Sequence, residues 1–221
     1  LAASAAVRDA AGGTAGAERD VLRRSGRLTL AVPAAFGGAE VPWPLLLAMV
    51  RRFAAADSSM AHLFGFQHLQ VATVCLYGSP AQHRRFLGAT VREGWFWGNA
   101  VNTRDARLRA SSDPAGWRLD GAKAFCSGAR GSDVLLVSGH TATGERPFFV
   151  LPSDRAGIRI HDDWDAFGQR QTDSGTVAFS EVQATADECL GPPPGTPRAS
   201  LRSLLSQSIL AAIYLGNAQG A

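Results

Sequence analysis

The chain contains 221 residues, of which 46% are hydrophobic and 19% are charged, and it carries a formal net charge of +3. This composition fits a soluble globular protein with a substantial core, built as one large domain or two modest ones. The basic residues are scattered, which argues against a nucleic-acid partner, and no apolar run reaches the roughly 18 residues of a transmembrane helix, which argues against a membrane protein.

The three cysteines, Cys75, Cys126 and Cys189, lie far apart and form no CxxC or Cys/His spacing, so we expect free thiols and no metal site. Free thiols are typical of a reducing cytoplasm, and we predict a cytoplasmic protein. The sequence begins Leu1-Ala-Ala-Ser, without an initiator methionine or the layout of a signal peptide. We therefore expect it to come from within a longer chain.

Residues 1–94 have the pattern of a helical domain. Short helices are expected over residues 1–11 and 17–26, because two glycines separate these segments. The next helix is expected to start at Pro42 or Pro44, since proline is tolerated in the first helical turn, and to end near residue 56.

A long apolar helix is expected to follow and to reach Tyr77. Ser58 or Ser59 is the expected N-cap, because a serine hydroxyl can accept a hydrogen bond from a free backbone N–H of the first turn. Gly78-Ser79-Pro80 then ends this helix and begins another, which we expect to end near Gly94.

From Trp95 onward the pattern changes to short strands. Apolar runs alternate with Gly, Asp, Pro and Ser, a spacing that is typical of a small sandwich or barrel. Strands are expected over residues 95–101, 117–120, 134–138, 147–151 and 175–179. We therefore predict a middle β domain over residues 95–190.

Residues 191–221 are predicted to be a linker and the first helix of a C-terminal helical domain. The run Gly191-Pro-Pro-Pro-Gly-Thr-Pro197 is expected to be a stiff connector. An apolar pattern at helical spacing follows from about Arg198 to the last residue, and a helix of this kind has to pack against other helices. The predicted fold class is therefore α+β, in the order helices, strands, helices.

The segment Gly121-Ala-Lys-Ala-Phe-Cys-Ser-Gly-Ala129 is the most distinctive part of the chain. It contains Lys123, the only lysine among 22 basic residues. Asp120-Gly121 predicts a turn into a strand that brings the Ser127 hydroxyl and several backbone amides to one place. Taken alone, the segment favours an ordinary β-hairpin, so its meaning depends on the rest of the chain.

Polar clusters within apolar context occur three times in the predicted β domain, over residues 97–103, 125–129 and 162–175. An isoalloxazine ring needs apolar or aromatic cover on its faces and amides or hydroxyls at its polar edge. Trp97, Phe125 and Trp164 could supply the cover, and the edge contacts could come from Asn99, Asn102, Thr103 and Ser127. No GxGxxG follows a predicted strand and no P-loop is present, so a Rossmann dinucleotide site is not indicated.

Four segments carry a resemblance to a known family. They are residues 54–66, residues 98–100, residues 125–133, and residues 162–164 together with 168–175. These segments, and the order of helices and strands, resemble the acyl-CoA dehydrogenase superfamily, and within it dibenzothiophene monooxygenase and its sulfur-acquisition relatives. The resemblance implies an acyl-CoA dehydrogenase-like fold that carries flavin-dependent oxygenase chemistry.

The resemblance also implies roles for individual residues. Ser127 falls where that group places a serine near flavin N5, and we expect it to be both a catalytic and a cofactor-binding residue. Asn99 and the residues after it, Ala100, Val101 and Asn102, match the segment that binds the flavin edge. Phe125 and Trp164 match aromatic residues that line the flavin, and Trp164 is also expected in the substrate pocket.

His62 matches a pocket histidine that assists oxygen activation or proton transfer, and an imidazole suits either role because its reference pKa is about 6.5. By position alone, a histidine packed within a helix bundle would explain His62 better, but on the resemblance we expect His62 to be a catalytic residue. Phe66 lies one turn further along the same face, and we place it in the substrate pocket. His68 lies about 240° around the helix from His62, so we expect it to be structural. Arg170 is expected to brace its own loop.

The leading hypothesis is a two-component flavin-dependent monooxygenase. A partner flavin reductase would supply reduced FMN, and O2 would add to it to give a C4a-hydroperoxyflavin that is shielded from water. One oxygen atom would then pass to a small organic molecule, for which an organosulfur compound is expected. FAD in place of FMN stays open, and the resemblance implies a homotetramer.

Two departures from the family keep alternatives open. The dehydrogenases carry Thr-Glu-Pro and Gly-Ser-Asp where this chain has residues 99–105, which argues against acyl-CoA oxidation. Sulfur-oxidising relatives have a tyrosine where this chain has Phe66, which leaves the substrate open because a pocket that binds a polar group discriminates strongly. The alternatives are an FAD-dependent acyl-CoA dehydrogenase and a non-catalytic scaffold whose aromatic clusters only pack.

Overall fold

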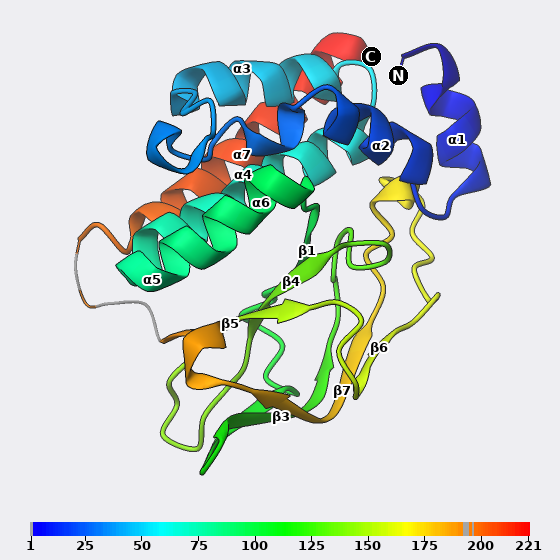
Figure 1. Ribbon diagram of the computed structural model, residues 1–221. Helices are drawn as coiled ribbons and strands as arrows, with labels where there is room; N and C mark the ends of the chain where they lie inside the picture. Colours follow the sequence, from blue (N-terminus) through cyan, green and yellow to red (C-terminus); the bar gives the residue numbers. More distant parts are fainter. Residues whose placement is uncertain (1, 192–194, 196) are drawn as a thin grey trace.

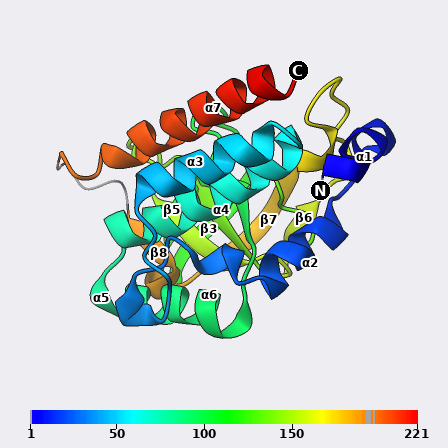
Figure 2. The same ribbon diagram turned by 90° about the horizontal axis from the view of Figure 1, so that it is seen from above.

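Helices form one layer of the molecule and strands the other (Figure 1). The computed structural model describes residues 2–191, 195 and 197–221. The N-terminal α-helices are α1 (Ala5–Ala11), α2 (Gly16–Arg24), α3 (Trp43–Ala54), α4 (Ser58–Tyr77), α5 (Pro80–Gln82) and α6 (Gly88–Glu93). After the strands, α7 (Leu201–Gly220) returns to lie along α3 and α4, as Figure 2 shows from above. The predicted α+β class and the order of helices and strands are confirmed.

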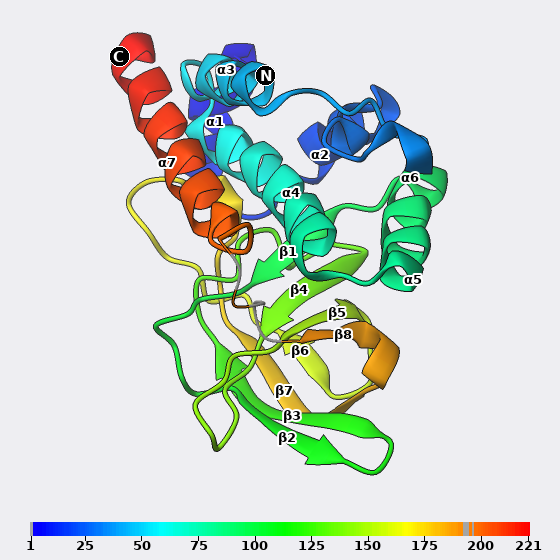
Figure 3. The ribbon, with the colours of Figure 1, turned by 90° about the vertical axis from the view of Figure 1, so that its left-hand side faces the viewer.

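The strands form two four-stranded sheets that share one core (Figure 3). The first sheet has the order β1 (Trp97–Ala100), β4 (Val134–Ser138), β5 (Phe148–Pro152) and β8 (Cys189–Gly191). The second has the order β2 (Arg109–Asp113), β3 (Gly116–Lys123), β7 (Val177–Ala184) and β6 (Ile158–Ile160). β1 is parallel to β4, whereas the other neighbours are antiparallel. Leu135 and Phe149 of the first sheet pack with Val177 and Phe179 of the second.

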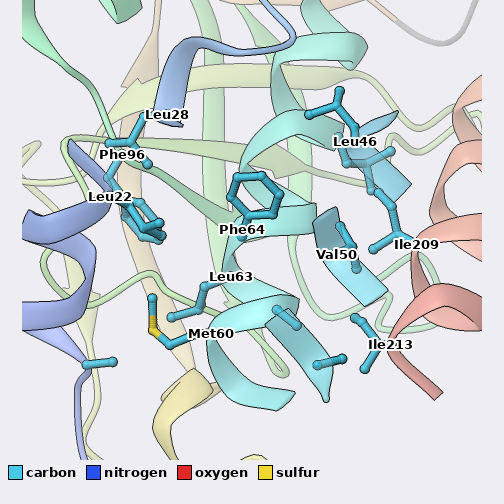
Figure 4. Close-up of a cluster of buried hydrophobic side chains, with 14 residues drawn as sticks. Leu22, Leu28, Leu46, Val50, Met60, Leu63, Phe64, Phe96, Ile209 and Ile213 are labelled. Atoms are coloured by element: carbon cyan, nitrogen blue, oxygen red, sulfur yellow. The ribbon is translucent and has the colours of Figure 1, made fainter. Parts of the chain in front are cut away.

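The helical layer has its own core, shown in Figure 4. Phe64 of α4 packs among Leu46 and Val50 of α3 and Ile209 and Ile213 of α7. This packing is close, because a Cβ built on Gly65 of α4 would lie 2.6 Å from the Ile209 Cγ2 atom. Burial of such side chains contributes roughly 1.5–3 kcal/mol each, and this core fixes α4 as the central helix.

The N-cap of α4 is Asp57, and the prediction of Ser58 or Ser59 was wrong. The chain enters the helix in an extended conformation at Asp57, with φ −160° and ψ 100°, and its carboxylate accepts a 2.9 Å hydrogen bond from the Met60 N–H. The same carboxylate accepts a 2.5 Å hydrogen bond from Arg8 Nη2, so it also connects α4 to α1. The capping hydrogen bond of Asp57 therefore begins the helix here, and the ion pair with Arg8 joins it to a segment 49 positions earlier.

The predicted turn at Asp120-Gly121 was also wrong. These residues lie inside β3, where the pairing with β7 shifts register between Leu119 and Gly121. Gly121 has φ +122°, and a Cβ there would lie 2.1 Å from the Arg107 carbonyl oxygen, so the glycine serves a bulge and a close backbone approach. The hairpin turn lies earlier, between Asp113 and Gly116, and β2, β6 and β8 were not predicted.

The predicted domain limits at residues 94/95 and 190/191 stay predictions, and α6 ends at Glu93 while β1 begins at Trp97. The expected stiff connector lies largely outside the described residues, because positions 192–194 and 196 are not among them. Within the described residues, no helix combines the length and the apolar character needed to cross a membrane.

Candidate functional site

Three chain segments meet around Ser127, which lies in the loop that follows β3. The Ser127 carbonyl accepts a 3.0 Å hydrogen bond from the Asn99 N–H at β1. On its other side, the Gly128 N–H donates to the Thr172 carbonyl at 2.9 Å, and the Cys126 N–H donates to the Gly175 carbonyl at 3.0 Å. The three polar clusters seen in the sequence therefore lie side by side.

Glycine makes this close approach possible. Gly128 has φ +66°, and a Cβ there would lie 2.9 Å from Leu63 of α4 and 3.0 Å from the ring of Phe96. The loop consequently packs directly on the helical layer, where α4 also carries His62.

The Ser127 hydroxyl is buried and hydrogen-bonded. The residue is 7% exposed, and its Oγ accepts a 2.8 Å hydrogen bond from Ser174 Oγ. Ser174 Oγ in turn lies 2.7 Å from Thr172 Oγ1, which donates to the Gln169 carbonyl at 2.8 Å. The backbone N–H of Ser127 has no hydrogen-bond partner among the residues that the structure describes. The position thus offers one hydroxyl and one amide to a ligand.

An aromatic pair, the exposed Phe125 and the half-buried Trp164, lies next to Ser127. The Phe125 side chain is 60% exposed, and its ring contacts the Trp164 ring edge-to-face with 5.8 Å between centroids. The Trp164 Nε1 donates to the Gln169 carbonyl at 3.1 Å, which holds the indole in place. The two rings line a hollow of about 180 Å³ together with Ser174 and Gly175. Phe125 has φ +59°, a conformation that costs a non-glycine residue about 1–3 kcal/mol and that concentrates at functional sites.

Asn99 presents a side-chain amide to the same region. It is 8% exposed, and its Oδ1 accepts a 3.0 Å hydrogen bond from Gln70 Nε2 of α4. Its Nδ2 has no acceptor among the described residues. The side chains of Ala100 and Val101 are buried in the core, so only their backbone groups could contact a ligand.

Lys123 and Asn102 stabilise the loop between β1 and β2. The Lys123 ammonium is fully buried and donates to the Asn102 carbonyl at 2.9 Å and to the Asp105 carbonyl at 2.5 Å. Burial lowers the pKa of Lys123 to about 8. The Asn102 side chain reaches the Ala124 carbonyl at 3.5 Å. These contacts give Lys123 a structural role, and they place Asn102 at the edge of the Phe125 loop.

His62 lies in α4, stacked on Phe66 with 4.2 Å between ring centroids and 9° between the ring planes. Both ring nitrogens are buried and have no hydrogen-bond partner within the described part of the chain. Burial lowers the pKa of His62 to about 4, and the nearby Gln169 side chain offsets this effect only in part. The imidazole is therefore neutral near pH 7.

The other candidates have structural surroundings. His68 contacts Phe64 edge-to-face at 4.7 Å within the helical core, and burial lowers its pKa to about 3. Arg170 donates its backbone N–H to Asp9 at 3.1 Å and its Nη1 to the Ala166 carbonyl at 3.1 Å, so it braces its loop. No group of three or more His, Cys, Asp or Glu side chains among the described residues could hold a metal ion.

Comparison with known proteins places this arrangement in a family. The acyl-CoA dehydrogenase N-terminal domain model matches residues 2–93. A probable FMNH2-dependent monooxygenase of Pseudomonas putida, SfnC, is 46% identical over 100% of this chain and 57% of its own length. The chain belongs to the acyl-CoA dehydrogenase superfamily.

Solved structures of superfamily members agree with this assignment. Methanesulfinate monooxygenase MsuC of Pseudomonas fluorescens has a TM-score of 0.96 and 43% identity over 99% of this chain and 58% of its own. FMN-bound TdsC, a dibenzothiophene monooxygenase of Paenibacillus sp. A11-2, has a TM-score of 0.90 and 40% identity over 99% of this chain and 59% of its own. The chain thus spans less than two thirds of the length of the superfamily members it matches.

The residues present fit a flavin such as the FMN of the FMN-bound TdsC structure. Phe125 offers an exposed aromatic face, whereas the Ser127 N–H and the Asn99 Nδ2 are donors without a partner among the described residues. A flat heterocycle with a polar edge needs this combination. Sequence reasoning assigned no role to Thr172, Ser174 or Gln70, although the first two lie in the third polar cluster. Their hydroxyl and amide groups could have marked these residues as candidates for the site. Which residues they contact is visible only in the folded structure.

Proposed function

We propose that the protein containing this chain is a two-component monooxygenase that uses reduced FMN and O2 to oxygenate a small organosulfur compound. The observation that carries the proposal is the meeting of Ser127, Asn99 and the Phe125–Trp164 pair in a chain that superposes on FMN-bound TdsC with a TM-score of 0.90. The SfnC and MsuC relatives support the chemistry, since both are named as monooxygenases.

The side chains around Ser127 would hold the flavin. Phe125 and Trp164 would cover the ring, while the Ser127 hydroxyl and N–H, the Asn99 amide and the backbone of residues 100–102 would meet its polar edge. When bound, reduced FMN supplies the electrons that activate O2. The buried apolar wall formed by Leu63 and Phe96 would keep water away, which limits loss of peroxide.

His62 is the proposed proton-handling residue. Its imidazole is neutral at pH 7 because burial lowers its pKa to about 4, so one ring nitrogen carries an N–H donor and the other is a hydrogen-bond acceptor toward a reacting group. Phe66 stacks on it and would line the substrate side together with Trp164. An apolar, aromatic pocket of this kind suits a soft sulfur centre, as the names of the dibenzothiophene and methanesulfinate relatives suggest.

A separate flavin reductase is the proposed partner, because no dinucleotide fingerprint follows a strand in this chain. We also propose a cytoplasmic homotetramer. Leu204, Tyr214 and Leu215 of α7 are exposed apolar side chains that further helices or subunits could cover.

Isotope transfer tests this function. The full-length protein would be mixed with photochemically reduced FMN, 18O2, and either dibenzothiophene or methanesulfinate, and the products analysed by mass spectrometry. We expect one 18O atom in the product and none without protein. Anaerobic bleaching of a bound FAD by an acyl-CoA would instead support a dehydrogenase, and absence of flavin binding would support a scaffold.

A further inference from the structure

Three buried hydroxyl groups form a continuous row that ends at Ser127. Thr172, Ser174 and Ser127 are 1%, 5% and 7% exposed. Thr172 Oγ1 lies 2.7 Å from Ser174 Oγ, and Ser174 Oγ lies 2.8 Å from Ser127 Oγ. The row begins at the Gln169 carbonyl, which lies 2.8 Å from Thr172 Oγ1. We call these three side chains the hydroxyl row.

The backbone that carries the row is held in an unusual conformation. Gln169 and Asp173 both have positive φ, +50° and +47°, which is uncommon for residues other than glycine. The Asp173 carboxylate accepts hydrogen bonds from Thr14 and pairs with Arg130 at 3.1 Å. Such conformations persist only where the surroundings enforce them, and here they bring Thr172 and Ser174 to the same side of the loop.

The hydrogen bond from Ser174 to Ser127 gives the row a direction. Each hydroxyl has one proton to donate. Ser174 donates its proton to Ser127, so Thr172 is the donor in its contact with Ser174, and its single proton is shared between Ser174 and the Gln169 carbonyl. The proton of Ser127 has no acceptor among the described residues, so it is the free end of the row. Hydrogen bonds in such a chain polarise one another, which strengthens the last donor.

We infer that Ser174 and Thr172 are positioning residues that hold the Ser127 hydroxyl as a hydrogen-bond donor toward an acceptor atom on the polar edge of the flavin. The inference rests on the proposed function and adds two residues to it. Without Ser174, the Ser127 Oγ loses the proton that fixes its orientation, and its own proton can rotate away from the ligand.

A double-mutant cycle on flavin affinity tests the inference. The dissociation constant of oxidised FMN would be measured by quenching of flavin fluorescence for the full-length protein and for Ser127→Ala, Ser174→Ala and the double variant. Loss of one neutral hydrogen bond corresponds to about two- to tenfold weaker binding for each single variant. Because Ser174 acts through Ser127, the double variant should bind no more weakly than Ser127→Ala. Independent, multiplying effects would overturn the inference.

Three further variants separate a positioning role from general damage to the fold. Thr172→Val removes the start of the row and should weaken binding in the same direction, whereas Thr172→Ser keeps the hydroxyl and should bind like wild type. Ser138→Ala is the matched control, because Ser138 is a fully buried serine on β4 whose hydroxyl has no partner within the described chain. A similar loss of affinity in Ser138→Ala would contradict the inference. Failure of the wild-type protein to bind FMN would instead overturn the proposed function.

Discussion

His62 and His68 place two uncharged imidazoles in the interior of α4, and this makes stability depend on pH. Burial lowers their pKa values to about 4 and about 3, below the reference value of about 6.5. The unfolded chain therefore takes up protons as the pH falls below about 6.5, whereas the folded chain does not until about pH 4. The free energy of unfolding should fall over this window by up to about 1.4 kcal/mol per pH unit for each imidazole.

Urea unfolding at pH 7, 6 and 5 checks this dependence. His62→Phe removes one of the two titrating groups and should flatten the fall in stability. Phe66→Leu, on the same face of α4, is the control, because it alters packing without removing a titrating group and should leave the pH slope unchanged. Equal slopes for wild type and His62→Phe would mean that His62 does not stay neutral in the folded protein.

Phe125 combines an exposed ring with a left-handed backbone, which favours ligand contact over stability. Its φ of +59° costs a non-glycine residue about 1–3 kcal/mol, and a side chain that is 60% exposed gains little from packing. Phe125→Gly relieves the backbone, whereas Phe125→Ala keeps the strain. We expect Phe125→Gly to unfold at a urea concentration equal to or higher than that of Phe125→Ala, while both bind FMN more weakly. A clearly less stable glycine variant would show that the conformation carries no strain.

For single residues, the sequence indicated candidates for the site but not which residues they contact. Ser127, Asn99 and Phe125 stand out because polar residues interrupt apolar runs there. Ser174 does not stand out, because its meaning depends on a 2.8 Å contact with a residue 47 positions away. The same limit applies to Gln70, whose contact with Asn99 joins a helix to a strand.

Among the elements, α4 depends on a cap that also joins it to α1. Asp57→Ala removes the acceptor of the Met60 N–H and the partner of Arg8. We expect a loss of at least about 1–2 kcal/mol in the free energy of unfolding, the usual effect of deleting a cap. Ser58→Ala, at the neighbouring position, should change stability by less than about 0.5 kcal/mol. Chemical denaturation of both variants shows which residue caps the helix. A larger loss of stability in Ser58→Ala than in Asp57→Ala would mean that the serine is the cap.

Elements with a strong pattern were predictable, and those defined by their neighbours were not. β4 was predicted at its observed limits, since Val134–Ser138 is buried throughout and reads as a continuous apolar run. β2 is an edge strand with the sequence Arg-Ala-Ser-Ser-Asp, which has no β-branched or large apolar residue; it pairs with β3 along its length and makes one isolated bridge to His140. Its pairing with β3, rather than its own composition, makes it a strand.

Across the whole molecule, the N-terminal helices hold the loop that carries the hydroxyl row. Figure 1 shows the turn at residues 170–172, in yellow, beneath α1. Arg8 Nη1 donates to Gln171 Oε1 at 2.6 Å, and Gln171 Nε2 donates to the Gly12 carbonyl at 3.1 Å. Residues near position 10 therefore hold the loop near position 170 in place. The sequence of neither segment, taken alone, indicates this contact.

Removal of the hydrogen bonds between the N-terminal helices and this loop should increase local opening of the loop without unfolding the rest of the molecule. In Asp9→Ala combined with Gln171→Ala, the loop loses a 3.1 Å hydrogen bond to the Arg170 N–H and both contacts of Gln171. Each such bond contributes about 0.5–1.5 kcal/mol, so local opening should become at least about tenfold more frequent. Hydrogen exchange should therefore speed up at the Gly128 N–H, which donates to the Thr172 carbonyl, while β4 amides keep their rates. Arg118→Ala, which removes an exposed 3.3 Å ion pair between β3 and β7, is the control and should leave Gly128 unchanged. Equal acceleration at Gly128 and in β4 would mean that the N-terminal helices stabilise the molecule as a whole rather than this loop.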